Sequence, residues 1–280
     1  MLVPPPRDPV RTFSYWGLKM KKLVLALTAL AAFTGSAMAA DIAPRYTKAP
    51  APLPVAPSWT GFYVFGGGGG GIWAADQHVQ TTTGALPLSI DQRQGGSGWF
   101  GTVGVGYDWQ VNTSWVVGVL ADGQFGSLKG TIQDPISGLS ASEKMQDAWA
   151  AGVRVGYLVA PNVLSYVNGG YSGSHWSGTN LYGTVSGIPV GEHTNSFNRN
   201  GWFVGGGFEN NLNIFGITAP GWFMKTEYRS AFYNAKNVNE LFDGTNAPVG
   251  HDIRFNTWNQ TISTSLVYRF NWSGPVVAKY

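Results

Sequence analysis

Apolar and polar positions alternate along the chain from Trp59 onward, in segments of about ten residues or slightly more. The last segment is the clearest, because its polar set includes Thr261, Ser265 and Arg269 and its apolar set comprises Trp258, Ile262, Leu266, Tyr268 and Phe270. A period of two places such sets on opposite faces of a β-strand. The pattern therefore predicts strands with one apolar and one polar face.

Five other segments alternate in the same way, namely 99–109, 115–125, 149–159, 202–209 and 222–232, and two near 60–73 and 163–176 alternate less clearly. Tight connections at 112–114 and 160–162 and a slightly longer one at 213–220 alternate with long polar stretches near 74–97, 127–146, 178–199 and 234–255. This arrangement predicts an all-β fold, an eight-stranded antiparallel transmembrane β-barrel with short periplasmic turns and four long external loops.

Composition decides between a membrane barrel and a soluble one. Of the 280 residues, 39 are aromatic and only 12% are charged, and tryptophans recur near the predicted strand ends, as in the girdles of membrane barrels. The 39 glycines include a run from Gly66 to Gly71, which formally matches a dinucleotide-binding motif. No helical pattern follows that run, so it is interpreted as a bent part of the first strand, where missing side chains permit close packing.

The N-terminal region carries an export signal. Met20-Lys21-Lys22 precedes an apolar stretch of 11 residues and the small-residue sequence Ala37-Met38-Ala39, which together indicate a cleaved secretory signal peptide. The predicted organisation is an upstream extension at 1–19, a signal peptide at 20–39, a Pro-rich periplasmic spacer at 40–58, the barrel at 59–270 and a C-terminal extension at 271–280.

The basic balance of the whole chain disappears with this processing. Removal of residues 1–39 takes five of the 18 Lys and Arg and one of the 15 Asp and Glu, which leaves 13 basic against 14 acidic residues. A nearly neutral chain without a basic patch gives no reason to expect nucleic acid as a partner. The absence of cysteine excludes disulfides and thiolate chemistry.

The predicted interior of the barrel collects equal numbers of opposite charges. Alternation points four acidic and four basic side chains inward: Asp108, Asp122, Glu209, Glu227, Arg154, Lys225, Arg229 and Arg269. Eight strands leave an interior that side chains just fill, so these groups should pair with one another. They form either a selectivity lining or a salt-bridged plug, and the narrow lumen favours the plug.

The order of these features resembles the alphaproteobacterial opacity-protein-like outer-membrane family. Ala40-Asp41 follows the predicted cleavage site, Trp59-Thr60-Gly61-Phe62-Tyr63-Val64 opens the barrel, and Leu266-Val267-Tyr268-Arg269-Phe270 closes it. The resemblance implies a porin-like or structural surface protein and antigen of a Gram-negative outer membrane. It also implies contact with lipopolysaccharide, insertion by the barrel assembly machinery, and attachment of Ala40 to peptidoglycan. The assembly signal would be Tyr268 and Phe270, or Tyr280.

Two alternatives concern histidines. Some outer-membrane barrels hydrolyse lipid A with a strand-borne His-x-Ser pair, and His175-Trp176-Ser177 has that spacing, with Glu192 as a conceivable orienting acid. The other histidines, His78, His193 and His251, lie in predicted external loops without ligand spacing to one another, so they are interpreted as ordinary surface histidines, and capture of a ligand or haem by the loops is a further alternative. We predict a non-enzymatic outer-membrane structural protein or narrow porin that contributes to envelope integrity, without a cofactor or metal.

Overall fold

The structure is a computed structural model that describes residues 58–214 and 217–270. Most of the predicted spacer and all of the predicted upstream extension, signal peptide and C-terminal extension lie outside these residues. The described part of the chain forms eleven β-strands: β1 (Gly61–Thr81), β2 (Gln92–Gln110), β3 (Trp115–Asp134), β4 (Leu139–Ala160), β5 (Val163–Trp176), β6 (Thr179–Gly183), β7 (Pro189–Thr194), β8 (Phe197–Ile214), β9 (Ile217–Tyr233), β10 (Lys236–Phe242) and β11 (Pro248–Arg269). The described residues include no helix long and apolar enough to cross a membrane.

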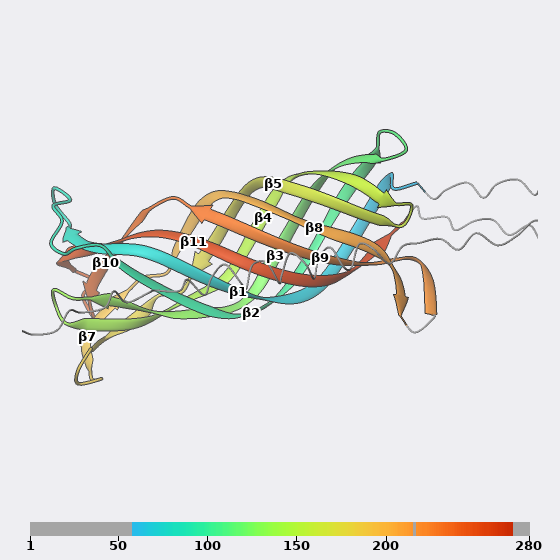
Figure 1. Cartoon of the computed structure of the whole chain (residues 1–280). Coiled ribbons are helices and arrows are strands. Elements are labelled where there is room, and N and C mark those ends of the chain that lie inside the picture. The colour runs from blue at the N-terminus through green and yellow to red at the C-terminus, as the bar shows by residue number, and fades with distance from the viewer. Residues whose placement is uncertain (1–57, 215–216, 271–280) are drawn as a thin grey trace, which may run out of the picture. The chain divides into compact units, whose positions relative to one another are not determined.

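Eight strands close into an antiparallel barrel through the pairing of β1 with β11. The ring runs β1-β2-β3-β4-β5-β8-β9-β11. At the end opposite the start of β1, three strands of this ring stop short, namely β5, β8 and β9. The shorter strands β6, β7 and β10 take their respective places in the sheet there (Figure 1). The second ring, β1-β2-β3-β4-β6-β7-β10-β11, extends the same barrel beyond the first, and we call this extension the outer barrel. The predicted eight-stranded barrel is therefore confirmed.

The first ring has the facing that alternation predicts. Its outer surface exposes valines and aromatic residues, while the predicted polar set points inward. At each of the two edges of this surface, neighbouring aromatic rings contact one another. The ring centroids lie 5.3 Å apart in the pair Trp115–Tyr157 and 4.5 Å apart in the pair Trp202–Phe232. An apolar band between two aromatic girdles is the surface of a membrane-spanning barrel.

Beyond the outer girdle the facing is inverted. Here buried apolar side chains fill the interior, including Trp73, Leu128, Ile132, Trp176 and Ile253, and we call this cluster the outer core. In β4 the switch occurs at a bulge between Met145 and Asp147, which moves the inward positions from odd to even numbers. Such an apolar interior and polar exterior suit a barrel surrounded by water rather than lipid.

The external segments differ from the expectation of long loops. The stretches near 74–97, 127–146, 178–199 and 234–255 are mostly strand, so the loops shrink to hairpin tips such as the connection between β3 and β4. Their Thr, Asn, Ser and Gly residues suggested loops because those residues occupy the water-facing side of the outer barrel. The long connections are external, as predicted, but they are folded.

The glycine run lies at the closing seam between β1 and β11. A Cβ at Gly67 would run into the carbonyl oxygen of Thr264, and one at Gly69 would run into that of Ile262. The outward-facing Gly66 has space, because a Cβ there would lie 3.9 Å from its nearest neighbours. Glycine at the inward positions therefore permits the close approach of the two backbones.

Candidate functional site

The structure brings all eight predicted inward charges together inside the first ring. Each is at most 7% exposed, and ion pairs connect them. They come from six strands: Asp108 from β2, Asp122 from β3, Arg154 from β4, Glu209 from β8, Lys225, Glu227 and Arg229 from β9, and Arg269 from β11. We call this set the lumen network.

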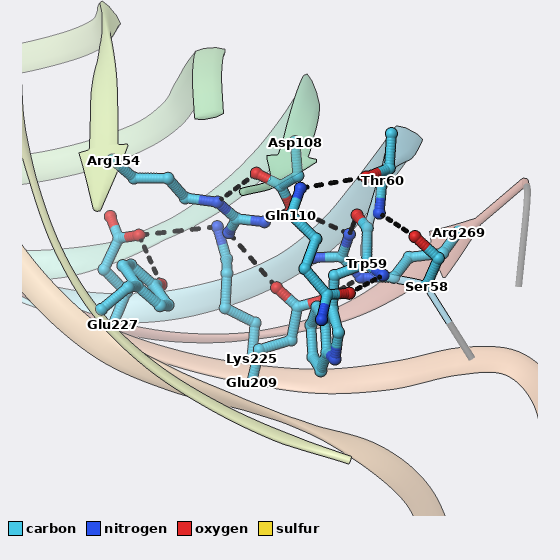
Figure 2. A network of polar contacts seen from close by, with 11 residues as sticks. Ser58, Trp59, Thr60, Asp108, Gln110, Arg154, Glu209, Lys225, Glu227 and Arg269 are labelled. Carbon is cyan, nitrogen blue, oxygen red and sulfur yellow. Dashed lines mark hydrogen bonds and ion pairs between the residues drawn. The ribbon is translucent and has the colours of Figure 1, made fainter. Parts of the chain in front are cut away.

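Two arginines share two carboxylates near the periplasmic end (Figure 2). The Arg154 guanidinium donates from Nε to Asp108 Oδ1 at 2.8 Å, pairs through Nη2 with Asp108 Oδ2, and donates from Nη1 to Glu209 Oε2 at 3.3 Å. Arg269 Nε lies 2.7 Å from Glu209 Oε1, and its Nη1 lies 2.8 Å from Asp108 Oδ2. Because the planar guanidinium presents several donors, two arginines can hold both acids in a closed four-residue ring.

A second group lies farther toward the outer girdle. Arg229 donates to both oxygens of Asp122, at 2.9 and 2.7 Å, and from Nη2 to Glu227 Oε1 at 2.7 Å. The other carboxylate oxygen of Glu227 accepts from the Tyr166 hydroxyl at 2.8 Å and lies 3.7 Å from Lys225 Nζ. The charges of this group are therefore also compensated inside the lumen.

Aromatic rings and glycines complete the packing. Lys225 Nζ lies 3.3 Å from the Phe65 ring centroid, and the Arg154 guanidinium carbon lies 4.3 Å from that of Tyr63. A Cβ at Gly118 would collide with the Asp108 carboxylate, so glycine there makes room for the acid. A cavity of about 10 Å³, lined in part by Arg229, Tyr233 and Asn259, has room for about one water molecule.

Trp59 covers the periplasmic side of the lumen network. Its indole is buried and stacks against Arg269, whose guanidinium carbon lies 4.3 Å from the ring centroid (Figure 2). The Trp59 backbone nitrogen donates to Gln110 Oε1 at 3.0 Å, and the indole nitrogen donates to the Pro161 carbonyl oxygen at 3.1 Å. Because Pro161 belongs to the turn between β4 and β5, Trp59 connects two walls of the barrel across its mouth.

The residues considered for lipid A hydrolysis have separate partners. His175 Nδ1 lies 2.6 Å from Asn198 Oδ1, whereas the Ser177 hydroxyl donates to the Lys144 carbonyl oxygen at 3.3 Å. Glu192 lies on β7, where its charge acts on Glu240. The structure therefore does not assemble these three residues into a relay.

The remaining histidines pair with acids that are distant in sequence or across a hairpin. His78 Nδ1 lies 2.8 Å from Asp91 Oδ1, and His193 Nδ1 lies 2.6 Å from Asp243 Oδ1. His251 Nδ1 faces two acids, Glu240 Oε2 at 3.0 Å and Asp134 Oδ2 at 3.7 Å. Spacing between histidines could not reveal that last group, because its other members are carboxylates brought in by β3 and β10. Ala40 lies outside the described residues.

The girdled eight-stranded ring with a charged, filled lumen defines a small outer-membrane β-barrel. The chain belongs to the family described as the outer membrane protein beta-barrel domain, whose model matches residues 25–270. It is an outer-membrane protein, which confirms the predicted family and location.

Similarity to characterised sequences supports this assignment. The chain is 30% identical over 264 residues to the 31 kDa outer-membrane immunogenic proteins of Brucella melitensis and Brucella suis, covering 90% of this chain and 100% of theirs. Among solved structures, the outer membrane protein OprG from Pseudomonas aeruginosa aligns with a TM-score of 0.48 at 10% identity, over 75% of this chain and 97% of OprG.

Proposed function

We propose that this chain is a structural surface protein of the outer membrane whose membrane-spanning lumen is closed by the lumen network, rather than an open diffusion channel. The observation that carries the proposal is the mutual pairing of eight buried charges beneath the Trp59 cover. A conducting lining needs charged groups that face water, whereas these groups face one another. Their pairing favours a bracing role.

Five of the seven ion pairs in the lumen network connect strands that are not neighbours in the ring. Arg154 on β4 contacts Asp108 on β2 and Glu209 on β8, and Arg229 on β9 contacts Asp122 on β3. These contacts cross the lumen and so fix the cross-section of the barrel. Buried pairs are weak evidence of net stability, but loss of one partner leaves an uncompensated charge and costs about 3–5 kcal/mol. The network therefore favours one barrel shape over alternatives.

Single-channel recording in planar bilayers tests the closed lumen. The refolded parent should be silent, whereas Arg229→Ala should raise conductance by opening space beside Asp122. Lys129→Ala is the matched control, because Lys129 is an exposed cation of the outer barrel. A steady conductance of the folded parent, with an ion selectivity that changes in Arg229→Ala, would instead establish a narrow porin.

A non-enzymatic role fits the separate partners of His175 and Ser177 better than lipid A hydrolysis does. Mass spectrometry of lipid A from a strain that overproduces the protein distinguishes the two. We expect the same acyl chains as in a strain without it, whereas deacylation that disappears in Ser177→Ala would identify a hydrolase.

We extend the proposal to the partners of the barrel. The names of the Brucella relatives describe immunogenic proteins, and the outer barrel of this chain would likewise be the part presented to antibodies. Lipopolysaccharide would surround the girdles, and the assembly machinery would recognise Tyr268 and Phe270. Ala40 would attach the mature chain to peptidoglycan, and muropeptides without an Ala40-bearing adduct would refute that attachment.

A further inference from the structure

A cluster of carboxylates surrounds His251 at the outer end of the barrel, away from the lumen network. Asp134 is the last residue of β3, Glu240 lies on β10, and His251 lies near the start of β11. Glu240 and Asp134 are 0% and 1% exposed, and the His251 side chain is 15% exposed. The site is therefore buried but reaches the external surface through the imidazole.

The hydrogen bonds around the cluster leave one side of it bare. Asp134 Oδ1 accepts from the backbone nitrogens of Ile136 and Ser137, at 2.7 and 3.3 Å, whereas Oδ2 has no hydrogen-bond partner among the described residues. Neither oxygen of Glu240 accepts from a donor group there, although Oε2 lies 3.0 Å from His251 Nδ1 and the Asp134 carboxylate lies close enough to share a proton with Glu240. Buried carboxylate oxygens without donors are costly unless a cation or proton compensates them.

More negative charge lies close by. Glu192 and Asp252 act on Glu240 together with Asp134, so three further carboxylates raise the cost of a charge on Glu240. Burial, and then the neighbouring Asp134, raise the pKa of Glu240 to about 8. The Thr82 hydroxyl compensates Asp252 in part by donating to Oδ1 at 2.9 Å. The remaining deficit of positive charge is centred on Glu240 and Asp134.

The imidazole is oriented for metal binding. His251 Nε2 lies 3.2 Å from the Ser137 hydroxyl, so a neutral ring that donates from Nε2 presents the Nδ1 lone pair to the carboxylates. In that tautomer, a lone pair aimed at two acids is unfavourable unless a cation or a proton lies between them. Ligating histidines usually have their second nitrogen held by such a hydrogen bond.

The geometry points to a divalent transition-metal ion of the zinc type held by Asp134, Glu240 and His251, and we propose this as an unrecognised metal site. One ligand atom from each residue lies within 4.8 Å of the others. The distances from Nδ1 to Glu240 and Asp134, 3.0 and 3.7 Å, lie on either side of the edge of about 3.3 Å expected for tetrahedral zinc with bonds of about 2.0–2.2 Å. One imidazole and two carboxylates suit such an ion, with a fourth position for water.

Zinc titration of the refolded full-length chain by calorimetry tests the site, after removal of bound metal with a chelator. We expect one Zn²⁺ per chain, with affinity reduced at least tenfold in Glu240→Gln and His251→Ala. His78→Asn is the control, because His78 pairs with the exposed Asp91 and is not part of the cluster. The zinc affinity of His78→Asn should equal that of the parent. Unheated gel migration and circular dichroism select folded protein for every comparison.

A shared proton on Glu240 is the competing explanation, and thermal unfolding separates the two. With a metal site, Zn²⁺ raises the Tm of the parent and of His78→Asn but not that of Glu240→Gln. With a proton alone, acidification raises the Tm of the parent and Zn²⁺ does not, which would overturn the proposal. Undiminished zinc binding by folded Glu240→Gln would overturn it as well. Neither result depends on whether the lumen conducts.

Discussion

Replacement of Glu143 by Gln should remove much of the pH dependence of barrel stability. Glu143 points from β4 into the outer barrel, is 1% exposed, and has no hydrogen-bond partner among the described residues for either carboxylate oxygen. Burial raises its pKa from 4.5 to about 8, although the Arg199 cation opposes the shift. Arg199 donates from Nη1 to the Thr257 hydroxyl and from Nη2 to the Phe255 carbonyl oxygen.

The sign of the effect follows from the raised pKa. Between pH 4.5 and about 8 the folded chain binds the Glu143 proton more tightly than the unfolded chain, so stability falls as pH rises through this window. A shift of about 3.5 units corresponds to about 5 kcal/mol in total, of which about 3 kcal/mol is lost between pH 6 and pH 9. In metal-free protein Glu240, whose pKa is also raised to about 8, adds a loss in the same window.

Urea unfolding in lipid vesicles at pH 6 and pH 9, followed by tryptophan fluorescence, measures the difference. The parent should be less stable at pH 9, and Glu143→Gln should retain only the part of the loss that comes from Glu240. Asp91→Asn is the control, because the Asp91 side chain is 80% exposed and should leave the pH dependence unchanged. Equal stability of the parent at both pH values, or an undiminished loss in Glu143→Gln, would refute the reasoning.

Three further predictions concern the membrane-spanning ring and the surface. Gly67→Ala should lower the urea midpoint because its Cβ meets the Thr264 carbonyl, whereas Gly66→Ala should match the parent; equal midpoints would contradict the seam packing. Arg154→Met should lower the free energy of unfolding by about 3–5 kcal/mol, since Asp108 and Glu209 are then left with the single cation of Arg269, and a loss below about 1 kcal/mol would argue against a bracing network. Ser177→Ala should leave both folding and lipid A unchanged, as unheated gel migration and mass spectrometry would show.

The first ring was predictable because lipid and a packed lumen impose a strict period of two. That period placed Arg154 and Glu209 inside before any geometry was known, and the structure finds them there. The period could not give the ion-pair partners, since Asp108 and Arg154 lie on β2 and β4, which are separated by β3 in the ring. Trp59 was predicted only as the start of the barrel, and its cover over the mouth depends on the distant Pro161 turn.

The outer barrel was missed for a physical reason. Its strands face water outside, and bulges and breaks reset the inward positions, so a single alternating register does not run through them. In β4 the inward residues pass from Met145 to Ala148 across the bulge, which interrupts the period of two. The cluster of Asp134, Glu240 and His251 depends on contacts between β3, β10 and β11 beyond the girdle and leaves no local sequence signal.

The position of Trp59 has a mechanical consequence. The residue precedes β1, and its hydrogen bonds reach Gln110 on β2 and Pro161 at the turn between β4 and β5. Tension that arrives through the preceding spacer, as it would in a chain bonded to the cell wall, would meet these contacts before it reached the β1–β11 seam. A pull on the N-terminal side would therefore be shared between two walls of the barrel instead of peeling the first strand from its neighbour.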